Sequence, residues 1–283
     1  MSRYEPEAYQ ADGGVSVLGL PLVVGSLVVT GVVLGWLASF LGQWIYLIVI
    51  FPGAMGFALF FAGLFGAKIG KLRNMALAVL LGFFAGAITL GTMHYCDYLR
   101  DVPPQPSFLA YLHHAATEGI SIGRGGSGFN IGYVGTWIYW VLEYLAVSIL
   151  AFLGIAVQVA EPFCRPCNRW METRELGRLE PSEVDLTEMI EQGDIESLRD
   201  HLSVSTTGNL ILSASACPEC RDEGPICLKL EALSHNEKGE ESRNHIITLV
   251  YPGEALADLD ELFASARPRK KKKRRRRDDD YDE

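Results

Sequence analysis

Long runs without charge make up most of the first 160 residues, and they constrain the fold more than any other feature. Val15–Phe40, Trp44–Gly66 and Met75–Met93 contain no Asp, Glu, Lys, Arg or His, and Gly132–Ala160 contains one charge, Glu143. A helix of about 20 apolar residues crosses the core of a bilayer, and it satisfies its own backbone hydrogen bonds, which lipid cannot do. Buried helices of soluble proteins are seldom so long and uncharged. The sequence therefore predicts an all-α membrane domain of four transmembrane helices over residues 15–160.

Charge is distributed unevenly along the rest of the chain. Residues 161–266 carry nine Lys or Arg and 22 Asp or Glu, a net charge of −13, whereas the whole chain has a net charge of −9. Residues 267–283 hold ten Lys or Arg followed by DDDYDE. Such segregation separates regions with different environments. We expect a disordered cytoplasmic N-terminus (1–14), the membrane domain, an acidic cytoplasmic domain (161–266) and a disordered tail (267–283).

Basic residues predict the orientation of the helices in the membrane. Lys68, Lys71 and Arg73 lie between the second and third runs, and loops rich in Lys and Arg stay in the cytoplasm. Both termini are then cytoplasmic and residues 94–131 are external. The polar first 14 residues and the length of the first run argue against a cleavable signal peptide. The expected location is the plasma or inner membrane, with the lipid bilayer in contact with all four helices.

Glu143 is the one ionisable residue inside a predicted span. A charge at the bilayer centre costs about 2.5–3.5 kcal/mol on insertion scales, so we expect Glu143 to find a partner among His94, Arg100 and Arg124 on the same side. Glu143 and His94 form a candidate intramembrane polar site. It is either a proton or ion site, or a structural pair in which the carboxylate reaches toward the interface.

The external loop, residues 94–131, is long for a connector. After Pro106, apolar residues at helical spacing predict a short amphipathic helix on the membrane surface. They are Phe108, Leu109, Tyr111, Leu112, Ala115 and Ala116. The loop also gathers residues of metal-ligating types, in a spacing that matches no motif: His94, Cys96, Asp97, His113 and His114.

The strongest chemical signal is a pair of C-x-x-C motifs in the acidic domain, Cys164-Arg-Pro-Cys167 and Cys217-Pro-Glu-Cys220. Four thiolates are enough to surround one tetrahedral zinc ion. The 49 residues between the motifs exceed the usual 15–20. A helical insert over Val184–Leu202, which Gly193 divides, accounts for the excess. Strand-like runs flank the motifs: Arg169–Leu179, Asn209–Ala216, Ile226–Leu233 and His245–Tyr251.

The paired motif over about 164–235 resembles a zinc ribbon, and the chain is similar to uncharacterised bacterial multi-span membrane proteins that carry such a domain in the cytoplasm. The resemblance implies a small α+β fold in which Cys164, Cys167, Cys217 and Cys220 ligate a structural Zn²⁺ ion. The long insert departs from the simple ribbon. Two other interpretations stay open, thiol–disulfide exchange and buried cysteines without metal.

The tail contains a run of basic residues, Lys270, Lys271, Lys272, Lys273, Arg274, Arg275, Arg276 and Arg277. A solubilising role, contact with anionic lipid, contact with nucleic acid and pairing with the acidic domain all fit this composition. Nucleic acid is disfavoured as a partner of the domain itself, because its net charge of −13 repels phosphates.

These observations favour a membrane protein that anchors a zinc-stabilised cytoplasmic domain for binding a protein partner, and none of them implies catalysis. Two alternatives remain. One is a transport or channel component that uses Glu143 and the external loop. The other is a membrane enzyme that uses the external His, Cys and Asp residues.

Overall fold

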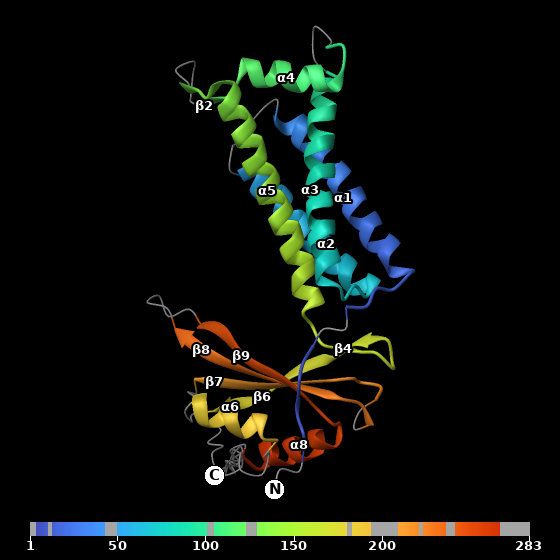
Figure 1. Cartoon of the computed structure of the whole chain (residues 1–283), viewed down its shortest axis with the longest axis vertical. Helices are drawn as coiled ribbons and strands as arrows, with labels where there is room; N and C mark the ends of the chain where they lie inside the picture. Colours follow the sequence, from blue (N-terminus) through green and yellow to red (C-terminus); the bar gives the residue numbers. More distant parts are fainter. Residues whose placement is uncertain are drawn as a thin grey trace, which may run out of the picture. The chain divides into compact units, whose positions relative to one another are not determined.

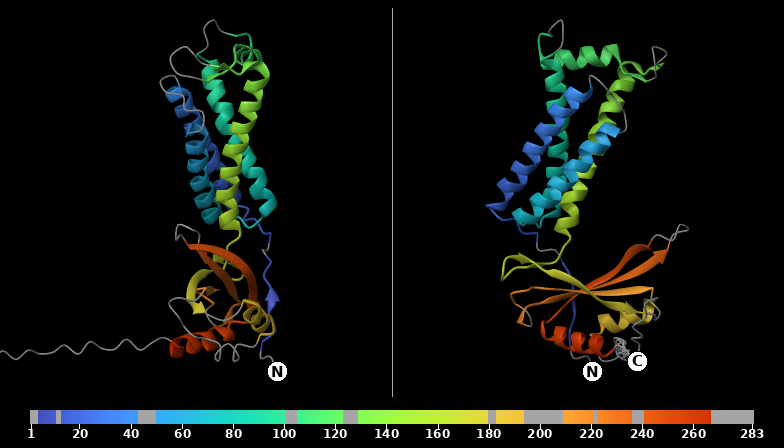
Figure 2. Two further views of the ribbon diagram at one scale, coloured as in Figure 1. Left: turned by 90° about the vertical axis from the view of Figure 1, so that its left-hand side faces the viewer. Right: turned by 180° about the vertical axis from the view of Figure 1, so that it is seen from behind.

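The structure, a computed structural model, describes residues 4–10, 13–42, 50–100, 105–122, 129–179, 183–193, 209–220, 223–235 and 241–266. The chain forms two compact units (Figures 1 and 2). Ala11–Glu161 make the membrane unit, and Met1–Gln10 together with Pro162–Glu283 make the second, called the sheet unit here.

Four helices of the membrane unit are long and apolar enough to cross a bilayer, so the four long apolar helices that the sequence predicts are present. They are α1 (Gly19–Gly42), α2 (Ile50–Gly70), α3 (Met75–Tyr98) and α5 (Gly132–Val159). Helices α1 and α5 each pack against both α2 and α3. The described ends of α1, α3 and α5 differ from the predicted runs by a few residues, and the predicted start of the second run, Trp44, lies outside the described residues.

Small residues bring these helices close together. A Cβ atom on Gly82 would lie 2.6 Å from Cβ of Phe152, and one on Gly31 would lie 2.9 Å from Oγ1 of Thr89. Gly82 and Gly31 therefore allow close contacts within one chain, between α3 and α5 and between α1 and α3 respectively.

The connection between α3 and α5 contains the predicted amphipathic helix, α4 (Phe108–Glu118), which lies across one end of the bundle (Figure 1). The hydroxyl of Ser107 caps this helix by accepting a hydrogen bond from the amide of Ala110. A short hairpin of β2 (Ser121–Ile122) and β3 (Phe129–Asn130) follows.

The sheet unit is built on a five-stranded antiparallel sheet in the order β1-β9-β8-β7-β6. Four strands match the predicted runs: β6 (Glu172–Leu179), β7 (Leu210–Ala216), β8 (Ile226–His235) and β9 (Glu241–Tyr251). A separate hairpin of β4 (Phe163–Cys164) and β5 (Arg169–Trp170) precedes them. The predicted combination of membrane helices with a separate sheet-containing domain is therefore present.

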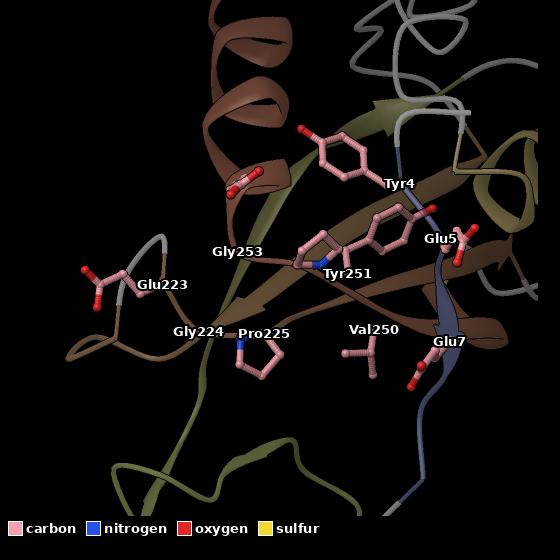
Figure 3. Close-up of a pocket in the computed structure, with 11 residues that line it drawn as sticks. Tyr4, Glu5, Glu7, Glu223, Gly224, Pro225, Val250, Tyr251 and Gly253 are labelled. Carbon is pink, nitrogen blue, oxygen red and sulfur yellow. The ribbon is translucent and has the colours of Figure 1, made fainter. Parts of the chain in front are cut away.

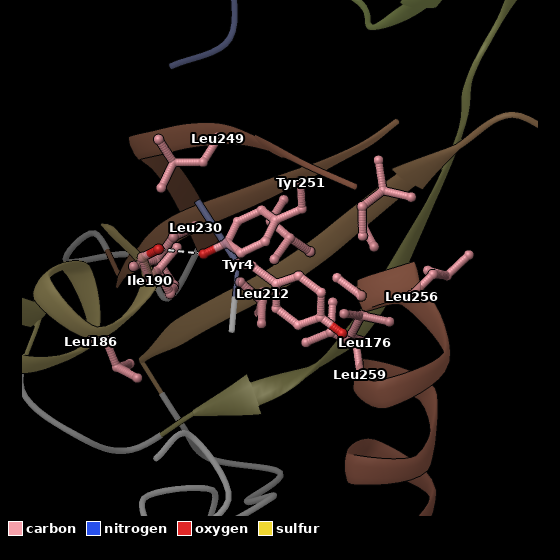
Figure 4. Packing of buried hydrophobic residues seen from close by; sticks show 14 of the residues in the cluster. Tyr4, Leu176, Leu186, Ile190, Leu212, Leu230, Leu249, Tyr251, Leu256 and Leu259 are labelled. Atoms are coloured by element: carbon pink, nitrogen blue, oxygen red, sulfur yellow. Dashed lines mark hydrogen bonds between the residues drawn. The ribbon is translucent and has the colours of Figure 1, made fainter. Parts of the chain in front are cut away.

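Two helices cover one face of the sheet, α6 (Glu183–Glu191) and α8 (Glu254–Ala266) (Figure 2). Their apolar residues join those of the strands in one core (Figure 4). In it, the hydroxyl of Tyr251 donates a hydrogen bond to the carbonyl of Ile190. Helix α6 is the first half of the expected insert, and Gly193 follows it with φ +71°. The second half falls on residues outside those that the structure describes.

The N-terminal segment differs from the disordered region expected from its polar sequence. Glu7 and Ala8 form β1, which pairs with Val250 and Leu249 of β9. Tyr4 is buried in the core, and its hydroxyl donates a 2.7 Å hydrogen bond to the carboxylate of Asp258. One aromatic side chain and two backbone pairs hold a segment that has too few apolar residues to be recognised from composition.

Candidate metal centre

The first C-x-x-C motif forms a tight hairpin. Cys164 ends β4 and pairs with Arg169 of β5, and Cys167 lies in the turn between the two strands. The turn is closed by a hydrogen bond from the amide of Asn168 to the carbonyl of Arg165, and Asn168 adopts φ +52°. Asparagine tolerates this left-handed conformation better than most residues. The turn thereby directs both sulfurs to one side of the hairpin.

The second motif follows β7, the strand between β8 and β6. Cys217 comes directly after Ala216, the last residue of β7, and Cys220 lies in the turn that follows. Gly224 approaches Cys220 so closely that a Cβ atom there would lie 3.2 Å from its sulfur. The absence of a side chain at Gly224 leaves room for the Cys220 thiol.

The two motifs meet, and all four sulfur atoms lie within 4.8 Å of one another. The Sγ atoms of Cys164 and Cys220 are 3.5 Å apart, and those of Cys167 and Cys220 are 3.0 Å apart. All four cysteines are free thiols. A tetrahedral ion with Zn–S bonds of about 2.3 Å separates its sulfurs by about 3.8 Å. The observed spacing brackets that value, so this group can hold a metal ion.

The thiols of the group ionise unequally. Burial raises the pKa of Cys164 to about 11. Burial also acts to raise the pKa of Cys217, but hydrogen bonds from the backbone amides of Cys220 and Glu219 outweigh it, and with the neighbouring thiols they lower that pKa to about 7. A hydrogen bond with Cys220 raises the pKa of Cys167. Without a cation, the group therefore favours a single thiolate stabilised by its neighbours.

A fifth cysteine, Cys227, lies beside the group without joining it. It is on β8, is buried, and contacts the Met171 sulfur at 4.0 Å. Burial raises the pKa of Cys227 to about 12. The side chain therefore acts as an apolar core residue in the small cluster that also contains Cys164 and Cys217.

The residues of the external loop do not converge. The His94 ring packs against Trp140, the His113 ring packs against Tyr133, and His114 pairs with Glu118 at 3.4 Å. Among the residues that the structure describes, the four cysteines are the one cluster of three or more potential metal ligands. The metal site considered for this loop therefore has no support in the described part of the chain.

The expected partner of Glu143 is also missing. Both carboxylate oxygens are buried and have no hydrogen-bond partner within the described ranges. Arg100 instead bonds to Ser39 and Asp97. Arg124 and the basic tail, Lys270–Arg277, lie outside the described residues.

An acidic groove of about 790 Å³ is a further feature of the sheet unit (Figure 3). It lies between the N-terminal segment and the loops that enter β8 and α8. Its apolar part is formed by two tyrosines, two prolines and a valine: Tyr4, Tyr251, Pro225, Pro252 and Val250. Four carboxylates surround them: Glu5, Glu7, Glu223 and Glu254. Sequence reasoning missed this groove because it depends on the unexpected position of the N-terminal segment.

Comparison of the chain with protein-family models, with curated proteins and with solved structures found no match. The resemblance to membrane proteins with a zinc-ribbon-like domain therefore rests on the paired cysteine motifs alone.

Proposed function

We propose that this protein anchors a zinc-stabilised domain to the cytoplasmic face of a membrane, where the domain binds a protein partner. The observation that carries the proposal is the convergence of four thiols from two C-x-x-C motifs on one point. Thiolate ligands in a tetrahedral arrangement favour Zn²⁺ or iron, and a site closed by four protein ligands leaves no position for a reacting water. We therefore assign the ion a structural role.

Zinc would join parts of the fold that otherwise have few contacts. One motif belongs to the β4–β5 hairpin and the other follows β7, so an ion ties that hairpin to the main sheet. Zinc binding contributes an apparent 10–16 kcal/mol, roughly, in zinc-finger peptides. A contribution of that order would dominate the stability of an acidic domain of this size.

The cytoplasmic location follows from two arguments. Lys68, Lys71 and Arg73 lie near the α2–α3 connection, and loops next to spans that are rich in Lys and Arg stay in the cytoplasm. Free thiols in a close cluster also persist in a reducing compartment, whereas an oxidising one would form disulfides.

The acidic groove is the surface that we propose for the partner. Four carboxylates around an apolar floor favour a segment that carries Lys or Arg next to apolar residues. Phosphate-rich ligands are disfavoured by the same charges. The basic tail of this chain is a competing occupant, and it can be separated from a partner by truncation after Ala266.

The metal assignment is tested on the full-length protein in detergent. We expect one zinc ion per chain by elemental analysis, and its loss in Cys220→Ser. Cys227→Ser is the matched control, because Cys227 is buried nearby but outside the group of four sulfurs; it should retain the ion. A well-folded protein without metal, or with iron in place of zinc, would contradict the assignment.

The partner surface is tested separately. A peptide that contains Lys, Arg and Leu should bind the chain truncated after Ala266, with an affinity that falls as salt is raised. Replacing Glu5, Glu7, Glu223 and Glu254 by Gln should weaken binding at least tenfold. The same replacement at Glu172, Glu188, Glu191 and Glu241, which do not line the groove, should leave it unchanged. Equal loss in both variants would show that only net charge attracts the peptide.

A further inference from the structure

A second polar region lies at the end of the bundle that carries α4. It is a cavity of about 320 Å³ between α1, α3, α4 and the first turns of α5. The polar side chains in its wall are Ser39, His94, Asp97, Tyr111 and Trp140. This region is separate from the cysteine group and belongs entirely to the membrane unit.

The acidic residue in the cavity wall, Asp97, has two polar partners. The Ser39 hydroxyl donates a 2.5 Å hydrogen bond to Asp97, and the Arg100 guanidinium lies 3.2 Å from the same carboxylate oxygen. Asp97 therefore has the partners that stabilise an ionised carboxylate.

Glu143 presents the opposite situation. It is 3% exposed, and neither carboxylate oxygen has a hydrogen-bond partner within the described ranges. Trp140, which lines the cavity, precedes Glu143 by three residues on α5, so the two side chains leave one face of the helix a turn apart. Because side chains tilt toward the N-terminus of their helix, the carboxyl group of Glu143 leans toward the turn of Trp140 and hence toward the cavity.

An ionised carboxylate at this position would be a buried charge without a counter-charge, which membrane interiors disfavour. The neutral acid carries no charge. We propose that Glu143 is a proton-binding site of the membrane unit, loaded reversibly from the cavity that Ser39, His94 and Asp97 line. In the loading step a hydronium ion in the cavity gives a proton to one carboxylate oxygen of Glu143, water is left behind, and the side chain changes from −1 to 0.

The other titratable groups near this site lie mainly at one end of the bundle. Helix α2 packs against α5, and the only titratable residue in its described part is Lys68, at the end away from the cavity. Helix α3 brings His94, Cys96 and Asp97 with its tyrosines and is followed by Arg100, and α4 brings Tyr111, His113, His114 and Glu118. All of those on α3 and α4 lie at the cavity end. A proton therefore reaches Glu143 past His94 and the neutralised Asp97–Arg100 pair.

The test is infrared spectroscopy of the full-length protein in lipid vesicles. We expect the carbonyl stretch of a protonated carboxyl group in the wild type, its shift on exchange into heavy water, and its reversible loss as the pH is raised. Glu143→Gln should abolish the pH-sensitive band. Glu118→Gln is the matched control, because this carboxylate on α4 lies outside the cavity wall, and this variant should retain the band.

Three results would overturn the proposal. The band could be absent at every pH, it could be insensitive to both pH and heavy water, or it could survive in Glu143→Gln. If that variant fails to fold, labelling of the wild type with dicyclohexylcarbodiimide replaces it, since this apolar reagent attacks protonated carboxyl groups in lipid. Peptide mapping should then find the label on Glu143 and not on Asp97, with less label at higher pH; any other distribution would refute the assignment. The outcome is independent of metal content, so it can fail while the zinc assignment stands.

Discussion

The guanidinium group of Arg169 lies 3.0 Å from the carboxylate of Glu219, and this ion pair joins one cysteine motif to the other. Arg169 follows Cys167 by two residues, and Glu219 lies between Cys217 and Cys220. The pair therefore lies on the surface above the sulfur group.

We predict that Arg169→Ala has little effect. Both side chains are about half exposed, and exposed ion pairs contribute about 0.2–1 kcal/mol. The free energy of unfolding, measured by denaturant titration, should fall by less than about 1 kcal/mol, with the metal content unchanged. Loss of metal in this variant would show that the ion pair, and not the sulfurs, sets the distance between the motifs.

Metal affinity should rise with pH. Without an ion, burial holds the pKa of Cys164 at about 11, so that thiol is protonated at neutral pH and must release its proton when metal binds. Binding therefore becomes tighter as pH rises, by about tenfold per unit for each proton released. The change of metal affinity with pH can be measured by competition with a chromogenic chelator between about pH 6 and pH 8. A flat profile would mean that all four cysteines are already thiolates.

Close packing of α2 and α5 predicts that Gly154→Ala destabilises the membrane unit. A Cβ atom on Gly154 would collide with the backbone carbonyl of Phe60, which cannot move without the helix. Overpacking of this kind costs about 1–3 kcal/mol. The matched control is Gly91→Ala on α3, where nothing lies within 4 Å. Thermal unfolding in detergent should separate the two variants, and equal behaviour would contradict the close contact.

Removing the side chain of Tyr4 should destabilise the sheet unit, because this side chain is buried in its core. Tyr4→Ala opens a cavity in the core and should cost about 3–5 kcal/mol. Tyr4→Phe keeps the ring but loses the hydrogen bond to Asp258 and should cost about 0.5–1.5 kcal/mol. Denaturant unfolding measures both, with Glu5→Ala as an exposed neighbouring control. If all three variants behave alike, the N-terminal segment is not part of the core in solution.

The sequence predicted the elements better than their arrangement. The spans were recognisable because uninterrupted apolar composition is a signal in itself, and β6, β7, β8 and β9 were recognisable because they are β-prone runs bounded by turns. The cysteine group followed from ligand chemistry and spacing. Helix α8 was not predicted from the sequence. Its amphipathic pattern is short, 13 residues, and lies at the junction between the acidic domain and the basic tail.

Features that depend on distant residues could not be predicted. The strand order, the position of Tyr4 in the core and the acidic groove all require contacts between the two ends of the chain. The candidate partners of Glu143 were selected only because they lie on the same predicted side of the membrane. One of them, Arg100, instead contacts Asp97 and Ser39.

The pairing of β1 with β9 has a consequence for biosynthesis. Tyr4 and Asp258 are 254 residues apart in sequence, so the segment that contains Tyr4 can join its sheet only after β9 and α8 have been synthesised. In the topology that we propose, four crossings of the membrane keep β1 and β9 on the same side, as their pairing requires.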